Sequence, residues 1–221
     1  MILIRKYLIG IGLMKSSKVE EYLDYLFPNP KCELIYHKDY ELLIAIVLSA
    51  QSTDKRVNQV TPILFDRYPS LNALKDAPLW ELEDIIHPVG SFRKKAYYVH
   101  EIAKLLVDKY HGVVPTDRDC LLCFPGVGRK TINVFLSEFY GEAAIAVDTH
   151  VERVSKRLRL ASLDDDVLTV EKKLMKKFSK DVWGKRHLQL VLFGRYYCKA
   201  VKPECANCQL MDICREKKKL K

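Results

Sequence analysis

The chain has 221 residues, a hydrophobic fraction of 48% and a formal net charge of +9. This length is long for one domain and short for two independent ones, so we expect two lobes that share the chain around a real apolar core. The excess of lysine and arginine favours a polyanionic partner over a neutral one, although ordinary solubility charge is the alternative explanation.

The N-terminal segment is apolar in places, but it does not look like a membrane span or a signal peptide. Arg5 and Lys6 interrupt apolar runs that are too short to cross a bilayer, and no small-residue cleavage site follows them. We therefore expect a soluble intracellular protein, cytoplasmic in a bacterial setting, with no membrane partner. Met14 is an alternative start of the chain.

Apolar residues recur with the period of a helix along nearly the whole chain, and no alternating strand pattern of useful length occurs. The predicted fold class is therefore all-α. The segment 40–50 is apolar nearly all round, which predicts a buried helix at the centre of one lobe. The predicted helices are 18–27, 40–50, one from 54 that Pro62 should kink or split, 70–75, 80–86, 92–110, one leading into 121–124, one from 129, 151–158, 167–178 and 185–197.

Several polar residues stand where helix caps are expected. Ser91 is predicted to cap the helix that follows it, with Arg93, Lys94 and Lys95 exposed near the start of that helix. The Thr116-x-x-Asp119 segment resembles a capping box.

The segment from Pro125 to Lys130 predicts a phosphate-binding turn. Gly126 and Gly128 lie between one apolar helix end and the start of another helix, which opens with Arg129 and Lys130. Glycines let backbone amides approach a ligand closely, and a helix N-terminus attracts anions. We therefore expect an oxyanion, most simply a phosphate, at this hairpin.

Four cysteines near the C-terminus follow the spacing C-x6-C-x2-C-x5-C: Cys198, Cys205, Cys208 and Cys214. Four thiols in one short segment indicate a metal site, because a disulfide framework is typical of secreted proteins. One segment wrapped around a compact centre favours a [4Fe-4S] cluster over zinc, and zinc stays open. Lys199 and Lys202 lie inside this loop, where they would either contact a phosphate or form an ordinary solvated charge pair.

The motifs PGVGRKT at 125–131, VDTHV at 147–151 and LSAQSTD at 48–54, together with the cysteine spacing, resemble the endonuclease III family of DNA glycosylases. The likeness runs from about residue 18 to Cys214. It implies a helix-hairpin-helix glycosylase fold with a six-helix lobe over 33–143 and a cluster lobe over 144–221 that the segment 1–32 completes. It also implies a monomer that removes oxidised pyrimidines from damaged double-stranded DNA and then cuts the strand.

The resemblance assigns roles by motif position. Lys130 corresponds to the catalytic lysine, Asp148 to the catalytic aspartate and Gln51 to a residue that fills the gap left by an extruded base. An attacking lysine must be neutral, and we expect burial, the helix N-terminus and Arg129 to disfavour its charged form. The plainer interpretations are that Lys130 contacts a phosphate and that Asp148 caps a helix.

Ser91 stands where the family tends to place an apolar wedge, which leaves intercalation at that point in doubt.

Three alternative functions remain. An adenine-removing mismatch glycosylase typically has serine at the lysine position and a glutamate where this chain has Ile46. A non-catalytic DNA-binding hairpin protein or a redox carrier would not need the pair of Lys130 and Asp148.

Overall fold

The computed structural model describes residues 17–216. These residues form two compact units, Glu33–Tyr140 and the combination of 17–32 with 141–216. Over 17–216 every regular element is helical, which confirms the all-α prediction. No helix in the same range is long and apolar enough to cross a membrane.

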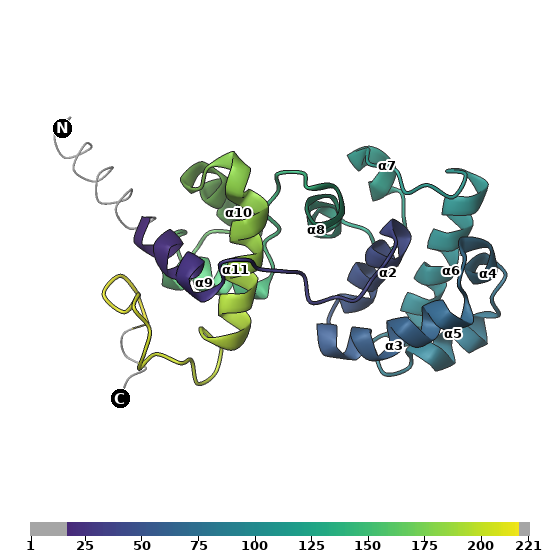
Figure 1. Cartoon of the computed structure of the whole chain (residues 1–221), viewed down its shortest axis with the longest axis horizontal. Helices are drawn as coiled ribbons and strands as arrows, with labels where there is room; N and C mark the ends of the chain where they lie inside the picture. Colours follow the sequence, from purple (N-terminus) through teal and green to yellow (C-terminus); the bar gives the residue numbers. More distant parts are fainter. Residues whose placement is uncertain (1–16, 217–221) are drawn as a thin grey trace. The chain divides into compact units, whose positions relative to one another are not determined.

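The unit Glu33–Tyr140 is built around α2, whose residues from Tyr40 to Leu48 are all buried. A helix that is apolar on every side can only be stable inside a shell of other helices. Figure 1 shows that shell. Its elements in chain order are α2 (Asp39–Ser49), α3 (Asp54–Arg67), α4 (Leu71–Lys75), α5 (Leu79–Ile86), α6 (Phe92–Asp108), α7 (Arg118–Leu122) and α8 (Arg129–Tyr140).

Helix α3 continues through Pro62, so the predicted split is wrong. Proline removes one backbone hydrogen bond and crowds the carbonyl one turn earlier. Buried Val57 and Val60 precede it and buried Leu64 follows it, and this packing holds both halves of the helix in place.

Two of the predicted caps are wrong in detail. Ser91 does stand at the N-terminus of α6, but its φ of 56° is left-handed and its side chain makes no capping bond. The cap of α7 is Asp117, whose carboxylate accepts the Cys120 amide at 2.8 Å, and not Thr116. A shift of one residue decides which side chain can reach the third amide of a helix.

The second unit consists of the helical residues 17–26 and the C-terminal helices, which share one apolar core. Leu23 from the N-terminal helix, Val151 from α9 and Phe193 from α11 are members of that core. The C-terminal elements are α9 (Thr149–Arg157), α10 (Val167–Lys177), the 3-10 turn η1 (Lys180–Val182) and α11 (Trp183–Tyr196).

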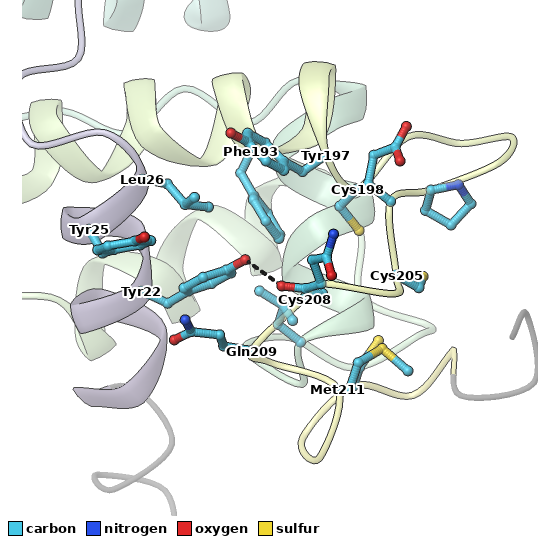
Figure 2. A pocket seen from close by; sticks show the side chains of 15 residues that line it. Tyr22, Tyr25, Leu26, Phe193, Tyr197, Cys198, Cys205, Cys208, Gln209 and Met211 are labelled. Carbon is cyan, nitrogen blue, oxygen red and sulfur yellow. Dashed lines mark hydrogen bonds between the residues drawn. The ribbon is translucent and has the colours of Figure 1, made fainter.

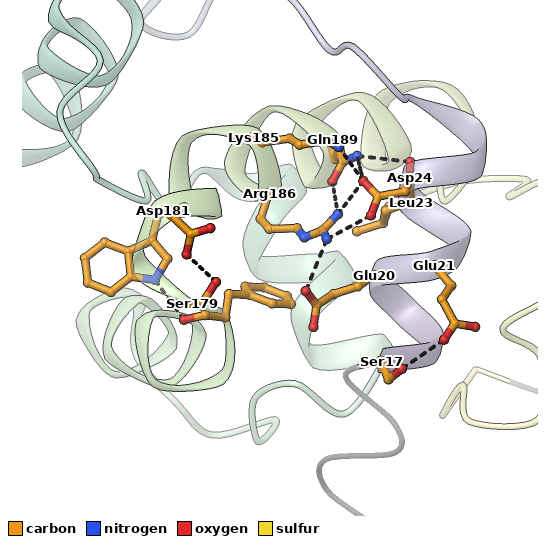
Figure 3. Close-up of polar contacts among 12 residues, drawn as sticks. Ser17, Glu20, Glu21, Leu23, Asp24, Ser179, Asp181, Lys185, Arg186 and Gln189 are labelled. Carbon is orange, nitrogen blue, oxygen red and sulfur yellow. Dashed lines mark hydrogen bonds and ion pairs between the residues drawn. The ribbon is translucent and has the colours of Figure 1, made fainter.

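A polar network fastens the N-terminal helix to α11 (Figure 3). The Arg186 guanidinium donates to both carboxylate oxygens of Asp24, at 2.8 and 2.9 Å, and to Glu20 at 3.1 Å. The Gln189 amide donates to the carbonyl of Phe27 at 2.8 Å, where the helix ends. The Arg186 bonds hold the pKa of Asp24 well below its usual range. The first segment of this unit is therefore joined to the last helix by charge as well as by apolar packing.

Candidate functional site

The predicted hairpin is present as α7, the turn 123–128 and α8. Gly126 has a φ of +78°, and a Cβ built there would lie 2.6 Å from Cδ2 of Tyr98 and 3.1 Å from Cγ1 of Val47. Only glycine combines this backbone conformation with so close an approach to α2 and α6. The Gly126 position is therefore needed to seat the turn on the rest of its unit.

Gly128 has a different place in the same turn. A Cβ built there would meet nothing within 4 Å, and the Gly128 carbonyl accepts the Ile132 amide at 3.0 Å as α8 begins. Gly128, Arg129 and Lys130 are all exposed. The twelve-residue helix α8 thus presents an open, cationic N-terminus, the kind of surface that binds a phosphate.

Lys130 lies in the first turn of α8 and is exposed. The expectation that the protein buries this amine is therefore wrong for the free chain. Lys130 stands at the helix N-terminus beside Arg129. Removal of water from the amine would have to come from a bound partner.

Asp148 belongs to the other unit and caps α9, as predicted. Its Oδ1 accepts the Val151 amide at 2.7 Å, and its carbonyl accepts the Glu152 amide at 2.8 Å. Its side chain is half-buried at the start of the helix. This bond orients the carboxylate, and a capping role does not conflict with chemistry at the same group.

Gln51 lies in the turn between α2 and α3, is exposed and has a left-handed φ of 54°. The neighbouring Ser52 hydroxyl accepts the Gly90 amide at 3.0 Å, which joins this turn to the one that carries Ser91. Lys95 is 4% exposed, so the prediction that it is a surface residue is wrong. Its amine turns inward to the Gln51 turn, and burial lowers its pKa.

The four predicted cysteine ligands all line one cavity of about 360 Å³ (Figure 2). Tyr22 and Phe193 contribute aromatic rings from the helices, and the loop contributes Cys198, Cys205 and Cys208, with Cys214 completing the lining. Over 17–216, no three side chains of metal-ligand type are gathered closely enough to hold a single metal ion.

Cys208 and Cys214 lie near other cysteines, and Cys198 lies beside a guanidinium. Burial raises the pKa of both the Cys208 and the Cys214 thiol, and the nearby cysteines raise both further. The guanidinium of Arg157 donates to the Cys198 sulfur at 3.4 Å and to the Lys199 carbonyl at 2.7 Å. Four thiols that line one aromatic-walled cavity are the type of donor set that a thiolate-bound iron-sulfur cluster uses.

The two loop lysines have different environments. The Lys199 amine forms an ion pair with Glu204 at 2.9 Å, and both side chains are substantially exposed. Lys202 is exposed and has a left-handed φ of 51°. Lys199 is thus held by a carboxylate, which any phosphate would have to displace.

Comparison with known proteins decides the family. A model of the HhH-GPD superfamily of base excision DNA repair proteins matches residues 44–180. Endonuclease III of Bacillus subtilis (strain 168) is 46% identical over 210 residues, which cover 94% of this chain and 96% of that protein. The chain belongs to the endonuclease III family.

Solved structures agree with this membership of the endonuclease III family. A trapped endonuclease III–DNA covalent intermediate, an estranged-adenine complex, is 48% identical and matches 93% of this chain and 99% of its own with a TM-score of 0.88. A thermostable thymine-DNA glycosylase shares the fold with a TM-score of 0.81 at 21% identity. The resemblance read from the sequence is therefore confirmed, and the chain is a base excision DNA repair enzyme.

Sequence reasoning missed two contacts within this endonuclease III fold. Lys95 precedes Val99 and Ile102 by four and seven residues, so it shares their buried face, and this register was a usable signal. Arg157 is 7% exposed and bonds the cysteine loop. Nothing in the local pattern around Arg157 indicates that a distant loop supplies its acceptors.

Proposed function

We propose that this chain removes oxidised pyrimidine bases from damaged double-stranded DNA and then cleaves the strand on the 3′ side of the abasic site. The observation that carries the proposal is the glycine hairpin that presents Lys130 at the exposed N-terminus of α8, in a chain of the endonuclease III family. The trapped covalent complex formed by a 48% identical relative supports a reaction through a covalent enzyme–DNA bond.

Lys130 acts as the nucleophile in this proposal. Its neutral amine attacks C1′ of the damaged nucleotide, and the bond from C1′ to the base breaks as the new nitrogen–carbon bond forms. The base leaves with the electron pair of the broken bond and takes up a proton. Opening of the sugar ring converts the adduct to a Schiff base, which makes the C2′ proton acidic, and loss of that proton expels the 3′ phosphate. Bound DNA removes water from the exposed amine and so favours its neutral form.

Asp148 supports this reaction as a carboxylate held in place by its capping bond to Val151. It stabilises the positive charge that develops on the sugar as the base departs, and it passes a proton to or from the sugar oxygen. A group that performs both steps must keep a fixed orientation, and a helix cap keeps it fixed without another side chain.

DNA binding follows from the same surfaces. The backbone amides at Gly126 and Gly128, with Arg129, hold a phosphate at the N-terminus of α8. The target nucleotide must leave the helix before its sugar can be attacked, and Gln51 fills the space that it vacates. Lys199 and Lys202 add weaker phosphate contacts from the cysteine loop. The protein performs these steps as a monomer inside the cell.

The cysteine cavity holds a [4Fe-4S] cluster through Cys198, Cys205, Cys208 and Cys214. The cluster supplies thiolate–iron bonds that cross-link the loop, and the reaction at Lys130 does not pass through it.

Borohydride trapping tests the catalytic assignment. Wild-type protein incubated with a thymine-glycol duplex and borohydride should yield a covalent complex, because reduction freezes the Schiff base. Lys130→Gln should abolish trapping and strand cleavage while it weakens binding by only about 1–3 kcal/mol, the value of one charge-assisted contact. Arg129→Gln is the matched control, since it removes a charge from the same turn and should still be trapped. Trapping of Lys130→Gln at the wild-type rate would assign the chemistry to another amine.

Metal analysis tests the cofactor assignment. The purified protein should be yellow-brown and contain about four irons per chain, as a [4Fe-4S] cluster requires. Cys198→Ser should lose iron and DNA binding together, whereas Cys123→Ser, a change outside the cavity lining, should keep both. One zinc per chain without iron would exclude the cluster.

A further inference from the structure

Three non-glycine residues of the unit Glu33–Tyr140 lie in the left-handed region, Gln51, Ser91 and His111, and the first two belong to turns that are bonded to each other. Gln51 has a φ of 54° and Ser91 a φ of 56°, and both side chains are exposed. Such a conformation is unfavourable for an L-residue, so it persists only where the surrounding structure imposes it. The amide of Gly90 donates to the Ser52 hydroxyl at 3.0 Å, so the residues next to Gln51 and Ser91 are directly bonded.

Lys95 connects both turns. Its amine donates to the carbonyls of Leu48 and Ala50, at 2.8 and 2.7 Å, and to the Ser52 hydroxyl at 3.1 Å. Its backbone amide bonds the Ser91 carbonyl at 3.1 Å. An ammonium group has three donors, and here all three have acceptors around the end of α2. The cation also lies where the negative end of a helix dipole favours it.

We propose that Lys95 is a positioning residue that holds the Gln51 turn against the Ser91 turn, so that the exposed Gln51 side chain meets DNA in a fixed orientation. This inference rests on the proposed function, because it assigns a partner to Gln51 in the displacement of the damaged nucleotide. Lys95 is 4% exposed and acts through the two turns rather than by touching DNA.

The physical reason is the entropy of ordering. Each backbone residue that becomes fixed only on binding costs conformational entropy, and this cost is subtracted from the energy available for unstacking the bases. The buried Lys95 amine, bonded to two backbone carbonyls and to the Ser52 hydroxyl, fixes both turns before DNA binds. Lys95 therefore lowers the cost of base extrusion without contributing a contact to it.

The test uses a duplex with 2-aminopurine opposite a tetrahydrofuran abasic analogue. The protein can bind this analogue but cannot convert it to a Schiff base. Insertion of Gln51 should unstack the 2-aminopurine and raise its fluorescence. Lys95→Met keeps the length of the side chain but has no donor, and we expect the extrusion equilibrium at saturating protein to fall about tenfold, as for the loss of charged hydrogen bonds. Lys104→Met removes the same charge from an exposed position on the same helix and should leave the signal unchanged.

A double-mutant cycle with Gln51→Ala separates positioning from general stability. If Lys95 acts through Gln51, the double variant should lose about as much extrusion as either single variant, whereas independent residues would multiply to about a hundredfold loss. Multiplied losses, or a normal signal from a folded Lys95→Met protein, would overturn the inference. If Lys95 were only a structural residue, the Lys95→Met protein would have a lower melting temperature, but at temperatures below that melting temperature it would show the full change in fluorescence.

Ser52→Ala provides a milder variant in case Lys95→Met does not fold. It removes the hydroxyl that accepts from both Lys95 and Gly90, so hydrogen exchange of the amides at 50–53 and 90–92 should speed up by about tenfold in the free protein. Unchanged exchange would contradict the clamp. Hydrogen exchange is measured without DNA, so its outcome does not depend on the proposed function. Failure of the proposed function would appear instead as wild-type protein that releases no base and forms no trapped complex.

Discussion

Gly126→Ala should destabilise the hairpin strongly. The residue has a φ of +78°, and the new methyl group would lie 2.6 Å from Tyr98 Cδ2. The left-handed conformation costs an alanine about 1–2 kcal/mol, and overpacking costs about 1–3 kcal/mol. A combined loss of about 3 kcal/mol lowers the melting temperature of a chain of this size by about 6–12 °C.

Gly128→Ala is the matched control for this prediction. A methyl group there meets nothing within 4 Å, so the loss should be at most about 1 kcal/mol, the usual cost of alanine before a helix. The same methyl lies on the proposed phosphate surface, so DNA affinity should fall about tenfold, the value of about one good contact. Differential scanning calorimetry and a DNA-binding titration measure both quantities.

The two variants should therefore separate stability from binding. Gly126→Ala lowers the melting temperature, whereas Gly128→Ala weakens DNA binding in a protein that melts nearly as the wild type does. Equal melting temperatures for both variants would refute the steric argument at Gly126. Unchanged affinity in Gly128→Ala would show that DNA does not approach this turn closely.

Three further predictions concern the other unit. Arg186 lowers the pKa of Asp24 in the folded state, so this carboxylate contributes stability that is present above about pH 4, the ordinary carboxyl range, and is lost as the pH falls through the folded pKa. In urea unfolding, the unfolding free energy of Asp24→Asn should therefore fall less steeply than that of the wild type between about pH 5 and 2. Parallel curves for the two proteins would contradict this linkage. Asp148→Asn can still accept the amide of Val151, so its unfolding free energy should change by less than about 1 kcal/mol while base release becomes much slower, and a large fall in melting temperature would favour a purely structural aspartate. Gly194→Ala would place a Cβ 2.8 Å from a side-chain carbon of α9. Overpacking of about 1–3 kcal/mol should outweigh the gain in helix propensity, so the variant should be less stable than the wild type. A raised melting temperature would show that α9 can move aside.

Local patterns in the sequence were sufficient for much of this protein. The helical period of its apolar residues predicts every long helix, because burying one face of a helix is a requirement that repeats along the chain. The glycine turn before Lys130 and the capping position of Asp148 depend on a few neighbouring residues, and the structure has both. The motif order also identified the family, which the comparisons confirm.

Other properties depend on residues far away in the chain. Pro62 stays inside a continuous helix and Ser91 adopts a left-handed backbone because neighbouring elements hold them there. Lys130 is exposed in the first turn of α8, although a neutral nucleophile suggests burial.

Lys95 and Arg157 show most clearly what only the tertiary structure decided. Each is a charged residue that a helical wheel treats as solvated, and each is buried because carbonyls from another segment replace its water. A periodic pattern reports the polarity of a side chain, but the acceptors that allow a cation to be buried are brought to it by folding. The apolar and glycine positions of this chain could thus be assigned from the sequence by itself, whereas the partners of its buried cations were determined only when distant segments packed together.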